Sequence, residues 1–190
     1  MTPEELPTTL ASLFGNTIQT LAPGSYQVET PDYRLLILLS DDQSWLRVLL
    51  PIVSAQDAQP YLEELLEANF DTTQETRYAL HQGVLWAVFQ HSCHGLSDAD
   101  FRGAIERLLF LHQQGLNDSF NTFVEKRIRQ IIQAAKRQGQ SLELTIQTLD
   151  RFYQEGLMGE MEMGARSREE VLAAWQRQLT RLWSEVEVSE

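Results

Sequence analysis

The apolar and polar positions of residues 33–53 (YRLLILLSDDQSWLRVLLPIV) predict a β-hairpin, because two apolar runs flank a short polar turn at residues 40–44. Residues alternate in direction along a strand, so each arm has two faces. In the first arm, one face carries Tyr33, Leu35, Ile37 and Leu39, and the other carries Leu36 and Leu38. In the second arm, one face carries Leu46, Val48, Leu50 and Ile52, and the other carries Trp45, Arg47 and Leu49. Because both faces are partly apolar, we expect the hairpin to be central in a sheet or covered on both sides.

Three further strands are expected beside this hairpin. Residues 25–30 (SYQVET) form a short apolar-polar run that ends at Pro31. Residues 76–81 and 84–91 flank the turn Gln82-Gly83 and predict a second hairpin. Local connections of this length require antiparallel pairing, since parallel strands need long crossovers.

Helical spacing of apolar residues predicts helices between and around these strands. The stripes run over residues 10–21, 58–70 and 101–112, and the last two follow the capping residues Ser54 and Ser97. The predicted order is therefore α-β-β-β-α-β-β-α. The fold class is α+β, an antiparallel sheet of about five strands with helices packed on it.

The remaining residues predict a C-terminal helical extension. Apolar stripes cover residues 116–135, 142–157 and 172–186, and a glycine- and methionine-rich link spans residues 156–164. We expect a domain at residues 1–113 and the helical extension at residues 114–190. These helices pack on each other, on the sheet, or across a dimer.

Composition and charge limit the function classes. No apolar run approaches the roughly 20 residues that span a bilayer, the first residues lack a signal-peptide pattern, and the single Cys93 fits a reducing cytoplasm. Residues 1–100 carry 3 basic and 14 acidic side chains, against 12 and 13 in residues 101–190. An acidic half repels phosphate and anionic lipid, so we expect neither a nucleic-acid nor a membrane partner. The single cysteine leads us to expect a cytoplasmic protein.

The strongest candidate for chemistry is the run His91-Ser92-Cys93-His94 at the end of the last strand. Cysteine and histidine are zinc ligands, and a histidine beside a cysteine can activate a thiolate. The spacing matches no common zinc site, however, and the sequence has no glycine-rich phosphate loop. The simpler interpretation is a strand end with a small buried thiol, and no cofactor is predicted.

Two features favour binding over catalysis. Aromatic side chains often anchor protein partners, although most of them lie in cores. Methionine-rich links form adaptable apolar surfaces, although a plain connector explains this one equally well. The candidate partner-binding residues are Trp45, Trp86, Trp175, Trp183, Met158 and Met161.

The hairpin 33–53, the helix 57–70 and the run 77–111 (RYALHQGVLWAVFQHSCHGLSDADFRGAIERLLFL) together resemble the type III secretion chaperone-like superfamily, which includes the Tir-chaperone and YbjN-like families. The resemblance covers about residues 1–113 and is greatest to a cyanobacterial branch. It implies a non-enzymatic fold that dimerises and binds partner polypeptides along apolar grooves and sheet edges. The helical extension departs from that pattern and puts a role in secretion in doubt.

We therefore expect a non-catalytic, protein-binding or chaperone-like adaptor that acts as a homodimer on an unidentified protein partner. The mechanism would be strand addition at a sheet edge or docking of an apolar segment in a groove. The alternative is a small metal- or thiol-dependent enzyme that uses His91, Cys93 and His94.

Overall fold

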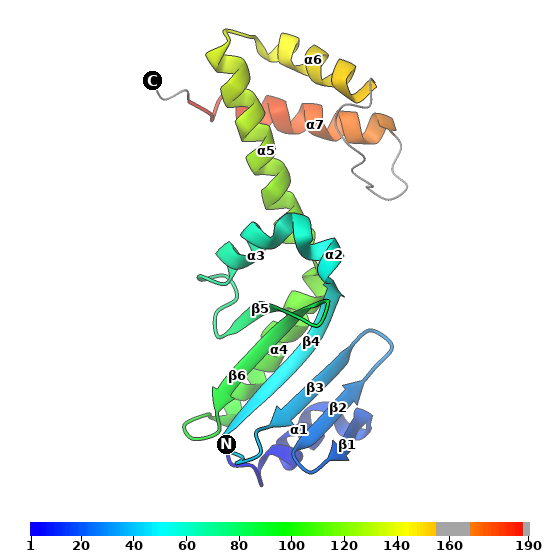
Figure 1. Ribbon diagram of the computed structural model, residues 1–190, viewed down its shortest axis with the longest axis vertical. Helices are drawn as coiled ribbons and strands as arrows, with labels where there is room; N and C mark the ends of the chain where they lie inside the picture. Colours follow the sequence, from blue (N-terminus) through cyan, green and yellow to red (C-terminus); the bar gives the residue numbers. More distant parts are fainter. Residues whose placement is uncertain (155–167, 188–190) are drawn as a thin grey trace. The chain divides into compact units, whose positions relative to one another are not determined.

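The computed structural model describes residues 1–154 and 168–187, and the chain forms two compact units, Met1–Phe120 and Asn121–Glu190. The division lies within helix α5 (Asn117–Arg137). The elements of the first unit, shown in Figure 1, are α1 (Leu6–Phe14), η1 (Gly15–Thr17), β1 (Ile18–Ala22), β2 (Ser25–Glu29), β3 (Arg34–Leu39), β4 (Trp45–Ser54), α2 (Ala55–Ala58), η2 (Gln59–Tyr61), α3 (Leu62–Ala68), β5 (Thr76–His81), β6 (Val84–Ser92) and α4 (Asp98–Gln114).

The strands form one antiparallel sheet of six strands in the order β1-β2-β3-β4-β6-β5. The two arms of the predicted hairpin, β3 and β4, occupy the centre and pair with Ile37 opposite Val48. On its other side β4 pairs with β6, and Val48 lies opposite Phe89. The predicted α+β class and the central position of the hairpin are confirmed.

The sixth strand, β1, corrects the prediction of a helix that continues to Leu21. Helix α1 ends at Phe14, where Gly15 adopts a φ of 56°, and a single 3-10 turn follows. A positive φ cannot continue a right-handed helix, and the β-branched residues after it favour extended backbone. Ile18 then pairs with Val28 of β2. The apparent helical spacing of Ile18 and Leu21 was therefore coincidental.

The main core lies on one face of this sheet, which α1 and α4 cover. Figure 1 shows α4 passing behind β4 and β6. Helix α4 begins at Ser97, whose side chain accepts a hydrogen bond from the Asp100 amide at 3.0 Å. The buried members of this core include Leu10, Val28, Leu35, Ile37, Leu46, Val48, Leu50, Ala87, Phe89, Phe101, Ile105 and Leu108.

A smaller apolar cluster holds α2 and α3 against the end of the sheet. Ala58, Leu65 and Leu85 are its buried members, and Tyr61 and Leu62 pack against them partly buried. Helix α2 begins at Ser54, whose side chain accepts a hydrogen bond from the Asp57 amide at 3.1 Å. Both predicted capping residues, Ser54 and Ser97, thus begin helices.

The second unit contains the rest of α5 together with α6 (Leu142–Gln154) and α7 (Arg168–Trp183), which confirms the predicted helical extension. Its buried residues include Ile128, Ile132, Leu179 and Leu182. Among the described residues, none of the helices has both the length and the apolar character required to cross a membrane.

A carboxylate network ties α5 to α7 inside this unit. Glu125 accepts hydrogen bonds from Arg129 at 2.8 Å and from Arg181 at 3.0 Å. These two guanidinium groups lower the pKa of the Glu125 carboxyl group. Arg129 also pairs with Glu185 at 2.9 Å, so Arg129 is held between two carboxylates.

The turn of the central hairpin is closed by one carboxylate. Asp42 accepts hydrogen bonds from the Ser40 hydroxyl at 2.6 Å, the Ser44 hydroxyl at 2.8 Å and the Ser44 amide at 3.1 Å. These bonds, led by that from Ser40, lower the pKa of Asp42 to about 2. Hydrogen bonds to the charged form favour that form, so the turn is held best by the ionised carboxylate.

We expect the stabilising contribution of Asp42 to depend on pH. Because its folded pKa lies below the ordinary value, the contribution is present above about pH 4 and is lost as the pH falls through about 2. Urea unfolding of the wild type and Asp42→Asn should show a difference at pH 6 that shrinks toward pH 2. Asp41→Asn, in the same turn, is the matched control. An Asp42→Asn difference that stays constant over this range would contradict the assignment.

Candidate functional site

The side of the sheet opposite α1 and α4 has no helix of the first unit packed on it among the described residues (Figure 1). Strand alternation and register place on this side residues of β3, β4 and β6 that belong to none of the apolar clusters. We call it the open face. It consists of Leu36, Leu38, Trp45, Arg47, Leu49, Trp86 and Val88.

The centre of the open face is an apolar row that runs across three strands. Leu36 of β3 lies opposite Leu49 of β4, which lies opposite Val88 of β6. Directly opposed residues in an antiparallel pair are close enough for their side chains to pack. Val88 is only 5% exposed although it belongs to none of the three clusters, so its neighbours on this face shield it from water.

Polar and aromatic side chains flank this row. Arg77 of β5 lies opposite Val88 and donates a hydrogen bond to the Gln90 side chain at 2.9 Å. The guanidinium carbon of Arg47 lies 5.0 Å from the centre of the Trp45 ring, in a cation–π contact. The open face therefore combines an apolar centre with arginines at its margin.

The two edges of the sheet differ in how they are protected. On β5, the Asn69 side chain accepts a hydrogen bond from the Tyr78 amide at 2.7 Å and donates one to the Tyr78 carbonyl at 3.1 Å. The Thr76 amide is also used, since it donates to the Thr73 carbonyl at 3.1 Å. A partner strand therefore cannot pair with β5 at these positions without displacing Asn69.

The opposite edge, β1, is less protected. Its sequence, Ile-Gln-Thr-Leu-Ala, has neither a charge nor a proline, two of the devices that block edge pairing, and its protection is limited to its short length and a register shift between Thr20 and Ala22. Within the described part of the chain, the outer side of β1 has no backbone partner, and Leu21 is 54% exposed.

A third apolar surface lies on and just beyond α3. Leu66 on α3 is 68% exposed, and Phe70, two residues past the end of this helix, is 92% exposed. The sequence pattern placed both on the inner side of one long helix, and this is wrong. The inward positions Ala58, Tyr61, Leu62 and Leu65 already complete one helical stripe, so Leu66 lies outside that stripe. Phe70 lies beyond the end of α3 at Ala68.

The run His91–His94 does not form a catalytic arrangement. Cys93 is buried, and burial raises the pKa of its thiol, which disfavours the reactive thiolate. The His91 ring stacks on Phe89 with centroids 5.8 Å apart, and its Nδ1 lies 2.7 Å from the Ser92 carbonyl oxygen. In the described residues no group of three His, Cys, Asp or Glu side chains could hold a metal ion.

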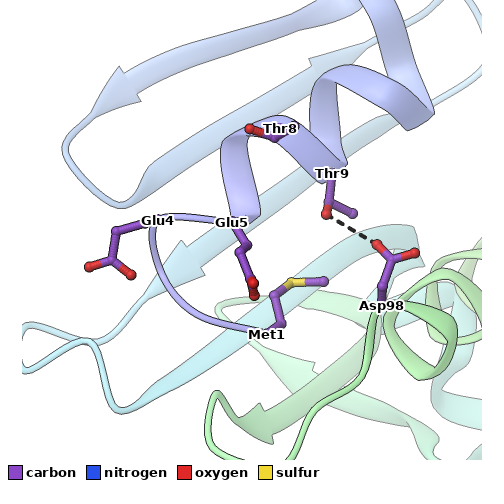
Figure 2. Close-up of a pocket in the computed structure, with 6 residues that line it drawn as sticks. All are labelled: Met1, Glu4, Glu5, Thr8, Thr9 and Asp98. Carbon is purple, nitrogen blue, oxygen red and sulfur yellow. Dashed lines mark hydrogen bonds between the residues drawn. The ribbon is translucent and has the colours of Figure 1, made fainter.

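A shallow hollow of about 540 Å³ lies beside the start of α1, as Figure 2 shows, with Met1, Glu4, Glu5, Thr8, Thr9 and Asp98 as its lining. Two of its carboxylates are engaged in local bonds. Glu5 accepts from the Thr2 amide at 2.8 Å, and Asp98 accepts from the Thr9 hydroxyl at 3.1 Å and from Arg102 at 2.6 Å. The Arg102 hydrogen bond lowers the pKa of Asp98. The Thr9–Asp98 bond joins α1 to α4, and together these bonds assign the two carboxylates a structural role.

The candidate partner-binding residues fall into three groups. Trp45 and Trp86 lie on the open face, and the Trp86 indole donates a hydrogen bond to the His81 carbonyl at 3.2 Å. Trp175 and Trp183 pack against the apolar cluster of the second unit. Met158 and Met161 lie outside the described residues.

No family model matches the sequence, and no curated protein matches it. Among solved structures, the chain is similar to the type III secretion chaperone SycH of Yersinia pestis in complex with a stable fragment of YscM2, with a TM-score of 0.46 and 15% identity over 60% of this chain and 98% of that chain.

It is also similar to the ExoU–SpcU complex from the type III secretion system of Pseudomonas aeruginosa, with a TM-score of 0.46 and 13% identity over 58% of this chain and 93% of that chain. For the HopA1–SchA chaperone–effector complex the TM-score is 0.44 and the identity 15%, over 59% and 90% of the two chains. At such identities and TM-scores the likeness does not establish a shared function.

Replacing Asn69 by Ala should lower the free energy of unfolding by about 1–3 kcal/mol, because it leaves the Tyr78 amide and carbonyl without their partner. Urea denaturation measures the loss. Asn16→Ala, at an exposed position in η1, is the control and should change stability by no more than about 0.5 kcal/mol. Equal midpoints for the two variants would show that Asn69 does not hold the edge.

Proposed function

We propose that this chain is a non-catalytic adaptor that binds a segment of another protein and acts as a homodimer. The observation that carries the proposal is the open face, where Leu36, Leu49 and Val88 form an apolar row on the side of the sheet away from the core. An antiparallel sheet with one face in water normally carries polar residues there. Leu36 and Leu49 are half-buried and Val88 is buried, so the row offers partly exposed apolar surface. Contiguous apolar surface is typical of protein interaction sites.

The arrangement of side chains supports binding and offers no support for catalysis. A nucleophile needs a neighbouring base and a charge-stabilising group, and Cys93 has a buried thiol with a raised pKa. The open face carries no acid, base or nucleophile pair, and its polar members are an arginine and the tryptophan indoles. Arginine and tryptophan are residue types that anchor protein partners.

We propose that the partner segment docks on the open face, with strand addition at β1 as a secondary contact. Asn69 occupies the β5 edge, so β1 is the edge with backbone groups available. Strand addition supplies affinity through main-chain hydrogen bonds and leaves specificity to side-chain contacts. The side chains of the open face would provide that specificity.

We propose that the homodimer forms through α3. Leu66 and Phe70 present a strongly exposed apolar pair, and Leu80 of β5 is 48% exposed on the strand that Asn69 ties to this helix end. A two-fold dimer places the same patch of both subunits in contact, so one apolar patch is sufficient. This surface involves other residues than the open face and leaves that face available to a partner.

The adaptor function predicts that a partner retained by the full-length wild type in a native-salt pull-down is lost with Leu36→Gln/Leu49→Gln. Both side chains contribute to the apolar row, and glutamine replaces them at similar size. Leu21→Gln, on β1, is the control and should keep most of the partner, while circular dichroism and thermal unfolding verify the fold of each variant. Equal retention by all variants, or no stoichiometric partner with the wild type, would overturn the proposal.

The dimer predicts that Phe70→Glu lowers the mass measured by light scattering from that of two chains to that of one. Burying a new charge in an apolar interface without a partner costs several kcal/mol. Glu67→Gln, three residues earlier and near the end of α3, also changes charge and should leave the dimer intact. A monomeric wild type at about 50 µM would refute the assignment outright.

A further inference from the structure

We propose that the segment received by the open face is acidic as well as apolar: a stretch of another protein in which carboxylates accompany large apolar side chains. This inference rests on the proposed function and names the chemistry of the partner. It follows from where the arginines of the first unit lie.

The first unit is strongly acidic, yet its sheet is not. Residues Met1–Phe120 contain five arginines, no lysine and 16 acidic residues. Three of the five arginines, Arg34, Arg47 and Arg77, lie on strands, and Glu29 is the only acidic residue of the six strands.

Strand register places all three arginines on the same side of the sheet. Arg47 alternates with the buried Leu46 and Val48, and Arg77 lies opposite Val88 of the open face. Arg34 lies two residues before Leu36 and forms an ion pair with Glu29. Because Glu29 neutralises Arg34, the net charge on this side comes from Arg47 and Arg77.

Arg47 and Arg77 are placed together and have no carboxylate partner among the described residues. Gln90 of β6 lies opposite Arg47 and accepts the hydrogen bond from Arg77, so the two arginines flank it from β4 and β5. Two strand spacings of about 4.8 Å and an offset of two residues along the strands put the two arginines roughly 12 Å apart at the backbone. Both lie beside the apolar row.

These contacts orient the guanidinium groups but leave their charge uncompensated. A cation–π contact holds Arg47 on Trp45, and a neutral amide holds Arg77. Arginine binds carboxylates through paired, charge-assisted hydrogen bonds, which are stronger than neutral ones. A docked segment with carboxylates near these groups would gain such bonds while its apolar side chains cover Leu36, Leu49 and Val88.

The total charge of the first unit and the local charge of its open face favour opposite kinds of segment. The summed charge attracts cationic segments, whereas the charge of the open face attracts anionic ones. At physiological ionic strength the Debye length is about 8 Å, so a segment in contact with Arg47 and Arg77 is governed by these residues. Local charge should therefore outweigh total charge once a segment is docked.

The test uses the full-length protein and two fluorescein-labelled peptides of about twelve residues. Both peptides carry leucine and tryptophan at the same positions, and glutamate in one is replaced by lysine in the other. Fluorescence anisotropy at 150 mM salt should give at least about tenfold tighter binding of the glutamate peptide, the scale of one charge-assisted hydrogen bond. Arg47→Glu and Arg77→Glu should each reverse or abolish the preference.

Arg107→Glu is a matched control, since Arg107 on α4 lies over the Phe110 ring at 5.5 Å in the same kind of contact as Arg47 with Trp45. It makes the same change in net charge away from the open face and should leave the preference unchanged. Equal loss in Arg107→Glu and Arg47→Glu would show that total charge decides, which overturns the inference.

Three other results would overturn the inferred preference for acidic segments. They also distinguish its failure from a failure of the proposed adaptor function. Tighter binding of the lysine peptide, lost with Leu36→Gln/Leu49→Gln, would keep the docking face and refute its charge preference. Absence of binding by both peptides would refute the inference, while the pull-down still decides the adaptor function. A change in oligomeric mass with Arg47→Glu would identify a second copy of the chain as the occupant.

Discussion

The antiparallel pairing of β4 with β6 is the interaction on which the first unit depends. It joins the central hairpin to a segment about 40 residues later in the chain and places Val48 beside Phe89 on one side of the sheet. The same register places Leu49 beside Val88 on the other side. Shifting one strand by a single residue would exchange these two faces, so this pairing creates the buried core and the open face together.

The two faces of the sheet differ in burial because helices of the first unit cover only one of them. Helices α1 and α4 bury the side with Val48 and Phe89, and the other side keeps an apolar row with arginines at its margin. Leu36 and Leu49 are not needed to hold α1 or α4, since they contact neither cluster of the first unit. This separation lets one face of the sheet supply stability and leaves the other for the proposed binding.

The charge of the first unit follows the same division. Its acidic residues lie outside the strands apart from Glu29, which pairs with Arg34. Net charge away from zero favours the solubility of a protein that carries an apolar face. Arg47 and Arg77 are the exceptions on the sheet, and their position beside the apolar row gives that face a charge opposite to the surrounding surface.

The sequence by itself determined the α+β class, the central hairpin 33–53, the capped starts of α2 and α4 and the helical extension, because alternation and capping are local signals. Only the tertiary structure decided that Ile18 begins a sixth strand, that Leu66 and Phe70 face outward, and that Arg77 joins Arg47 across Gln90. These features depend on a glycine turn, on the end of α3 at Ala68 and on pairing between distant strands. Alternation in the hairpin already placed Leu36, Arg47 and Leu49 on one face, but a local pattern contains no record of which strand lies beside which. Only the assembled sheet adds Trp86 and Val88 to the open face.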